Sequence, residues 1–156
     1  MPRHYTSHLM KTKLAALLLL VTSMFSFGHG GVELGPNKGR LLEFSKNETM
    51  HGEVTVKDGK FHIAVLDRDM KQVAMTDQSL TAITGDRNSP QKLEVTKTDK
   101  GFSVPAVKSG EWLIMQFKLT PKAKAITARM EYNTSNCEGC NKAEWLCACK
   151  KVDEKK

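Results

Sequence analysis

Apolar and polar residues alternate with a period of two along much of the chain from Leu41 onward, a pattern typical of β-strands with one buried face. The clearest signal is a pair of alternating runs, 53–57 and 60–66, separated by Asp58-Gly59. Asp-Gly favours a two-residue hairpin turn, because both turn positions need positive φ. The pattern predicts a hairpin whose second strand turns three side chains to one face: Phe61, Ile63 and Val65.

Further strands are expected along the rest of the chain. Residues 67–71 indicate a turn, followed by a short strand at 72–75. A second hairpin is predicted from 92–96 through a turn at 99–101 to 102–104, where Pro105 ends the strand or marks a sheet edge. The longest apolar run, 111–119, predicts a central strand, and 125–132 predicts another. Their inward residues would be Leu113, Met115, Phe117 and Leu119 in the first, and Ile126, Ala128, Met130 and Tyr132 in the second.

About seven or eight short strands with no strong helix predict an all-β fold. An immunoglobulin-like antiparallel β-sandwich is the natural way to bury two alternating faces. The domain is expected over 31–135, followed by a short cysteine-rich and basic C-terminal tail at 136–156. A Cys…Trp…Cys pattern that spans the sandwich, as in antibody domains, is absent. The expected likeness is therefore one of arrangement only.

The first thirty residues have the pattern of a secretory signal peptide. A basic opening with Arg3, Lys11 and Lys13 precedes an apolar run at 14–27, and small residues follow it. Cleavage is expected after Gly28 or after Gly30, and translation from either Met1 or Met10 fits. The apolar run is shorter than the roughly 20 residues that a spanning helix needs. We expect a bacterial periplasmic or secreted protein with no stable membrane span after cleavage.

Charge gives little indication of a partner. The 126 residues after the leader carry 21 Lys and Arg against 17 Asp and Glu. The basic residues are scattered, apart from a dense group in the last seven positions. Nucleic-acid binding would favour a basic stripe with interleaved aromatic residues, which the sequence lacks. We therefore expect no nucleic-acid partner.

All four cysteines lie within thirteen residues, as Cys137-x-x-Cys140 and Cys147-x-Cys149. In an oxidising compartment they could form two disulfides, with bonds crossing between the pairs because a bridge within Cys-x-Cys would be strained. Alternatively, the four thiolates could hold one soft metal ion, zinc or copper, with Gly139 allowing a tight turn around it. The sequence leaves both interpretations open.

A third interpretation treats Cys137-x-x-Cys140 as a dithiol redox centre. It is disfavoured, because no βαβ unit precedes the motif and Glu138 should raise the pKa of a neighbouring thiol. Between the two cysteine pairs, Trp145-Leu146 is expected to be an apolar plug that docks the tail on the sandwich.

A second, weaker metal site is possible at the mature N-terminus. Cleavage after Gly28 would place His29 first, where the amino group, backbone nitrogens and imidazole form a chelate suited to Cu(II). His51 and His62, with neighbouring methionines, could add ligands. Methionines at alternating positions are more often core filler, and His62 falls on the polar face of its strand.

No catalytic constellation is visible. Ser103 and Ser109 lack a nucleophile-elbow setting, and several aspartates fall in turns where their carboxylates bond the backbone. We expect a protein that is not an enzyme.

The segments 35–43, 51–59 and 61–67 resemble small exported bacterial β-domains. Such domains occur alone or as N-terminal parts of periplasmic adaptor subunits of heavy-metal efflux systems. The resemblance covers roughly 29–75 and is carried by Gly35-Pro-Asn-Lys-Gly39-Arg40 and the Asp58-Gly59 hairpin. It implies a periplasmic, metal-related setting with an efflux component or other periplasmic protein as partner. It does not extend to the cysteine tail.

The sequence thus favours an exported, non-enzymatic domain that binds or handles a metal, with Cys137, Cys140, Cys147 and Cys149 as the site. A disulfide-stabilised interaction module without metal is the first alternative. A thiol–disulfide redox protein is the second.

Overall fold

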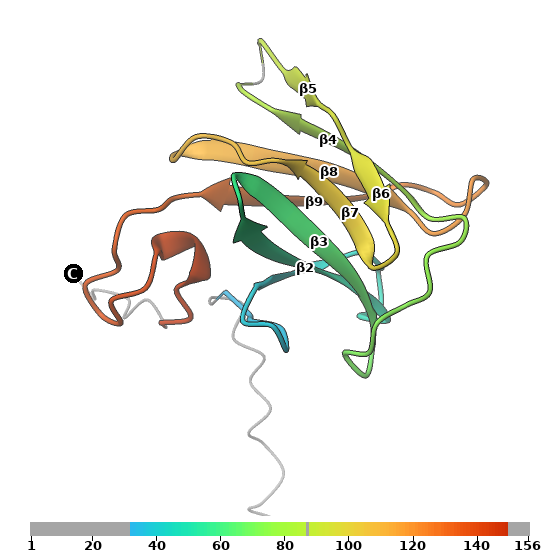
Figure 1. Cartoon of the computed structure of the whole chain (residues 1–156), viewed down its shortest axis with the longest axis horizontal. Helices are drawn as coiled ribbons and strands as arrows, with labels where there is room; N and C mark the ends of the chain where they lie inside the picture. The colour runs from blue at the N-terminus through green and yellow to red at the C-terminus, as the bar shows by residue number, and fades with distance from the viewer. Residues whose placement is uncertain (1–31, 87, 150–156) are drawn as a thin grey trace, which may run out of the picture.

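The computed structural model describes residues 32–86 and 88–149, and Figure 1 shows their arrangement. These residues form nine strands and one short 3₁₀ helix. The elements are β1 (Arg40–Glu43), β2 (Met50–Lys57), β3 (Lys60–Asp67), β4 (Ser79–Thr84), β5 (Gln91–Leu93), β6 (Thr96–Thr98), β7 (Gly101–Pro105), β8 (Glu111–Lys118), β9 (Ile126–Tyr132) and η1 (Glu144–Leu146). No helix in the described part of the chain has the length and apolar character needed to cross a membrane.

Two antiparallel sheets face each other. One has the order β1-β2-β3-β7-β6 and the other β5-β4-β8-β9. Within these, β2-β3-β7-β6 follows the A-B-E-D order of an immunoglobulin domain, and β4-β8-β9 follows its C-F-G order. β1 is an extra edge strand beside β2, and β5 an extra edge strand beside β4. The immunoglobulin-like sandwich is confirmed, with nine strands rather than the expected seven or eight.

The Asp58-Gly59 hairpin is confirmed in register and turn geometry. Lys57 pairs with Lys60, and both turn residues have positive φ, 52° and 70°. Phe61, Ile63 and Val65 are buried against the second sheet. The sequence signal is strong here because turn chemistry and alternation indicate the same local structure.

The segment 91–98 corrects the second predicted hairpin. Instead of one strand at 92–96, the chain forms β5 on β4 and then β6 on β7, so it changes sheets between Leu93 and Thr96. The hairpin turn before Gly101 is present, but it joins β7 to β6 alone. Because the chain switches sheets here, one short segment supplies an edge strand to each of the two sheets.

Two other expectations are wrong. Residues 72–75 form only an isolated bridge, Leu66 to Gln72, because the chain leaves this sheet there to enter β4 in the other. Leu119 is exposed, since β8 ends at Lys118. The remaining inward residues of β8 and the central ones of β9 lie in the core, including Met115 and Met130, each fully buried.

Aromatic side chains pack among the aliphatic residues of the core, and one of them comes from the C-terminal tail. Phe44 stacks on Phe117 with ring centroids 4.6 Å apart. At the other end, Phe61 meets the edge of Tyr132 at 4.9 Å. Trp145 of the tail belongs to the same buried cluster. The sandwich core therefore extends into the segment that carries the cysteines.

Candidate metal centre

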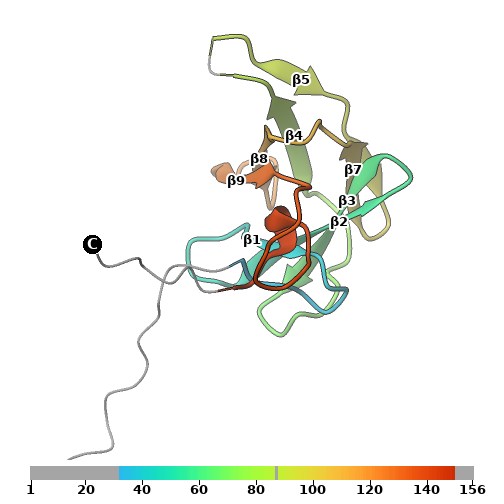
Figure 2. The same ribbon diagram turned by 90° about the vertical axis from the view of Figure 1, so that its left-hand side faces the viewer.

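The described part of the cysteine tail, 136–149, lies at the side of the sandwich where β1 and β9 form the outer edges of their sheets. After β9 the chain folds back through η1, as Figures 1 and 2 show from two directions. Backbone bonds fix this return: Glu144 N–H donates to the Ser135 carbonyl (2.8 Å) and Trp145 N–H to the Asn133 carbonyl (3.0 Å). The segment between the two cysteine pairs is thus tied to the end of β9.

Trp145 anchors the tail in the open edge between the sheets. Its side chain is only 6% exposed, and its ring meets Tyr132 at 5.3 Å and Phe61 at 6.4 Å in edge-on geometry. Arg40 of β1 donates to the Trp145 carbonyl at 3.4 Å, and burial lowers the pKa of this guanidinium, with Glu131 acting in the opposite direction. The predicted role of Trp145 as a docking plug is confirmed. The Arg40 contact had no sequence signal, because it joins residues 105 positions apart.

The first cysteine pair sits on a tight turn. Cys137 N–H donates to the Lys142 carbonyl (2.8 Å), and Asn141 N–H donates to the Cys137 carbonyl (2.9 Å). The left-handed residue of this turn is Asn141, with φ 55°, and not Gly139. Asn is among the few non-glycine residues that adopt this conformation readily, which is the signal that the sequence analysis missed.

Gly139 has a different role from the one expected. A Cβ atom there would lie 3.3 Å from Cys149 Sγ and 3.8 Å from Cys137 Sγ. The glycine therefore leaves space for the sulfurs of both segments. Its contribution is steric.

The four sulfur atoms converge. All lie within 4.8 Å of one another, and all four cysteines are free, partly exposed thiols. Cys147 Sγ is 3.1 Å from Cys137 Sγ, and Cys140 Sγ is 3.7 Å from Cys147 Sγ. A tetrahedral zinc–thiolate centre with bonds of about 2.3 Å places its sulfurs about 3.8 Å apart. One of these contacts, Cys140 to Cys147, already has this spacing, and the limit of 4.8 Å leaves the other sulfurs small movements away from it.

Because the four thiols lie close together, their pKa values shift in different directions. The pKa of Cys137 is lowered, chiefly because Cys147 donates a hydrogen bond to its sulfur, and the backbone of Gly139 contributes. The pKa of Cys147 is raised by the same bond, and neighbouring thiols, first Cys140, raise that of Cys149 to about 12. The pKa of Cys137 thus moves in the direction opposite to the one expected beside Glu138, because hydrogen bonds to its sulfur dominate. A bound cation would remove these opposing shifts, because it binds all four sulfurs as thiolates.

In reduced, metal-free protein we expect Cys137 to react first with iodoacetamide near neutral pH and Cys149 last. A lowered pKa leaves a larger thiolate fraction, and the thiolate is the nucleophile. Mass spectrometry of the tryptic peptides 130–142 and 143–150 after brief labelling measures the order. Labelling of Cys149 ahead of Cys137 would contradict this order of pKa values.

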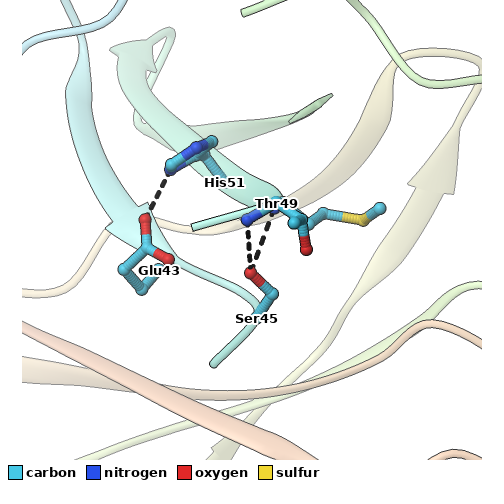
Figure 3. A network of polar contacts seen from close by, with 5 residues as sticks. Glu43, Ser45, Thr49 and His51 are labelled. Atoms are coloured by element: carbon cyan, nitrogen blue, oxygen red, sulfur yellow. Dashed lines mark hydrogen bonds and ion pairs between the residues drawn. The ribbon is translucent and has the colours of Figure 1, made fainter. Parts of the chain in front are cut away.

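The two histidines in the described part of the chain, His51 and His62, do not join this centre. His29 lies outside the described residues. His51 is buried beside β1, where its Nδ1 pairs with the Glu43 carboxylate at 2.5 Å, as Figure 3 shows. His62 is exposed on β3. Within 32–86 and 88–149, the cysteine cluster is the one group of His, Cys, Asp or Glu side chains suited to holding a metal.

The position of Cys137 in the fold can be compared with that of the first cysteine in a dithiol redox centre. A dithiol centre of the thioredoxin type places its first cysteine at a helix N-terminus. Here Cys137 lies in a turn, and η1 begins at Glu144, after the first pair. In the described part of the chain, no helix begins at Cys137 to activate its thiol.

No protein-family model, curated protein or solved structure matches the chain at a significant level.

Proposed function

We propose that this protein is an exported, non-enzymatic β-sandwich domain that binds one soft metal ion through Cys137, Cys140, Cys147 and Cys149. The observation that carries the proposal is the convergence of four sulfurs from two chain segments within 4.8 Å. Four thiolates and no oxygen ligand suit zinc or Cu(I). The ion would supply charge neutralisation and cross-linking between the two segments.

Elemental analysis and native mass spectrometry of reduced protein, loaded with zinc and separately with Cu(I), test this site. We expect one ion per chain in the wild type and none retained after gel filtration in a Cys140→Ser/Cys149→Ser variant. His62→Ala, which removes a potential ligand on the exposed face of β3, should retain full stoichiometry. Four reduced thiols with no bound ion in the wild type would overturn the proposal.

Export is the second part of the proposal, and the pattern of the first thirty residues supports it. Expression of the full chain in a bacterium should give mature protein in the periplasmic fraction. N-terminal sequencing should find either His29 or Gly31 first. An intact leader on cytoplasmic protein would refute export. A start at His29 would also supply the predicted Cu(II) chelate.

The resemblance of residues 29–75 to domains of heavy-metal efflux systems supports a place for the protein beside such a system, as a metal-handling accessory to a periplasmic partner. The partly exposed sulfurs fit this role, since thiolate ligands from a partner could reach the ion. Pull-down of candidate efflux subunits with metal-loaded and metal-free protein would test it.

A further inference from the structure

We propose that the cysteine cluster is also an oxidation site with a defined product, in which disulfides Cys137–Cys147 and Cys140–Cys149 form and the metal is expelled. The release of metal rests on the proposed function, whereas the pairing does not. The oxidant is a two-electron thiol oxidant, with hydrogen peroxide as the probe.

Local geometry requires both bonds to cross between the two segments. Cys147 and Cys149 are separated by a single residue. A disulfide between them would close a small ring that takes the bond away from its preferred geometry, so Cys147 and Cys149 do not bridge each other without strain. Complete oxidation therefore needs each of them to pair with a cysteine of the first turn.

Sulfur positions select one of the two crossed pairings. Cys147 Sγ is nearest to Cys137 Sγ, at 3.1 Å, and lies farther from Cys140 Sγ, at 3.7 Å. Closing the shorter contact to a bond of about 2.05 Å needs a movement of about 1 Å. The sulfurs of Cys140 and Cys149, within 4.8 Å of each other, are then left as the second pair.

The surrounding scaffold does not depend on the state of the sulfurs. The turn is held by the backbone bonds of Cys137 and Asn141, and the return segment by those of Glu144 and Trp145. The Trp145 ring is fixed by the sandwich core. Oxidation can therefore exchange one cross-link for another while the tail stays docked. The cysteines are partly exposed, so a small oxidant can reach them.

The reaction balances without a further co-reactant. A zinc ion with four thiolates and two molecules of hydrogen peroxide yield two disulfides, one free zinc ion and four hydroxide ions. Four thiolate sulfurs lose four electrons in total, and the two O–O bonds accept them. Disulfide sulfurs carry no charge, which removes the attraction that held the ion.

Titration of zinc-loaded protein with hydrogen peroxide, in the presence of a chromophoric zinc chelator, tests the proposal. Non-reducing tryptic digestion follows, because cleavage after Lys142 separates the two cysteine pairs. We expect one zinc released per two equivalents of peroxide, and peptides 130–142 and 143–150 joined as one covalent species. Separate peptides, each lighter by two hydrogens, would show bonds within the pairs and overturn the proposal.

Two double variants test which crossed pairing forms. Cys140→Ser/Cys149→Ser leaves the 3.1 Å pair, and Cys137→Ser/Cys149→Ser leaves the 3.7 Å pair. Faster cross-linking in the first variant is expected, and faster cross-linking in the second would overturn the assignment. If wild-type protein binds no metal yet yields the joined peptides, the proposed function fails and the pairing stands. If metal binds but no cross-link forms, the proposed pairing fails and the proposed function stands.

Discussion

Replacing Trp145 with alanine is expected to lower the free energy of unfolding by about 3 kcal/mol, since truncating a buried aromatic side chain loses its transfer energy and leaves a cavity. The side chain is 6% exposed and lies against Tyr132 and Phe61 in the open edge of the sandwich. Urea denaturation of the reduced, metal-free protein, followed by far-ultraviolet circular dichroism, measures the change. Working without metal isolates the contribution of packing from that of ligand binding.

Trp112 provides the matched control. It is the same residue type on β8, but 44% exposed, so Trp112→Ala should change the unfolding free energy by no more than about 0.5 kcal/mol. Equal losses from the two substitutions would contradict the docking of the tail. A Trp145→Phe variant should recover part of the loss, because a smaller ring still fills the edge.

The sheet elements that the sequence predicted are those with strong alternation or distinctive turn chemistry. The β2–β3 hairpin combines both. β4 was missed because its inward residues include Ala82 and Thr84, which weaken the apolar alternation. β1 was missed because four residues are too few to establish a period. The division of 91–98 between two sheets is a tertiary effect, since a single continuous strand satisfies the same local pattern.

The cysteine tail could be located from sequence, but its geometry could not. Clustering of Cys137 to Cys149 indicated a site, and Trp145 indicated docking. Whether the sulfurs converge depends on how the turn at Asn141 and the return through η1 are fixed on β9. Those constraints come from bonds to Asn133 and Ser135 and from the sandwich edge. A linear pattern does not contain them.

The conformation of the loop at 35–39 is explained by a buried carboxylate, that of Glu53. Glu53 points away from the sandwich core on β2, yet it is only 1% exposed because this loop covers it. Its oxygens accept hydrogen bonds from Asn37 N–H (2.7 Å), Asn37 Nδ2 (2.8 Å) and Gly39 N–H (3.0 Å). A Cβ on Gly35 would lie 2.5 Å from Glu53 Cδ. The Gly-Pro-Asn-Lys-Gly segment is therefore shaped around one side chain.

Glu53→Ala is expected to destabilise the fold by about 3 kcal/mol, because it removes the acceptor of three donors and leaves them in a cavity. Glu53→Gln should cost less, since its one oxygen still accepts while its amide group faces the Asn37 side chain. The matched control is Glu94→Ala, which removes an exposed carboxylate and should be nearly neutral. Urea denaturation gives all three values. If Glu53→Ala unfolds at the wild-type urea concentration, water satisfies the loop amides and the carboxylate does not hold the loop. A loss equal to that of Glu53→Gln would assign the effect to the second carboxylate oxygen and its negative charge, because the glutamine keeps the shape.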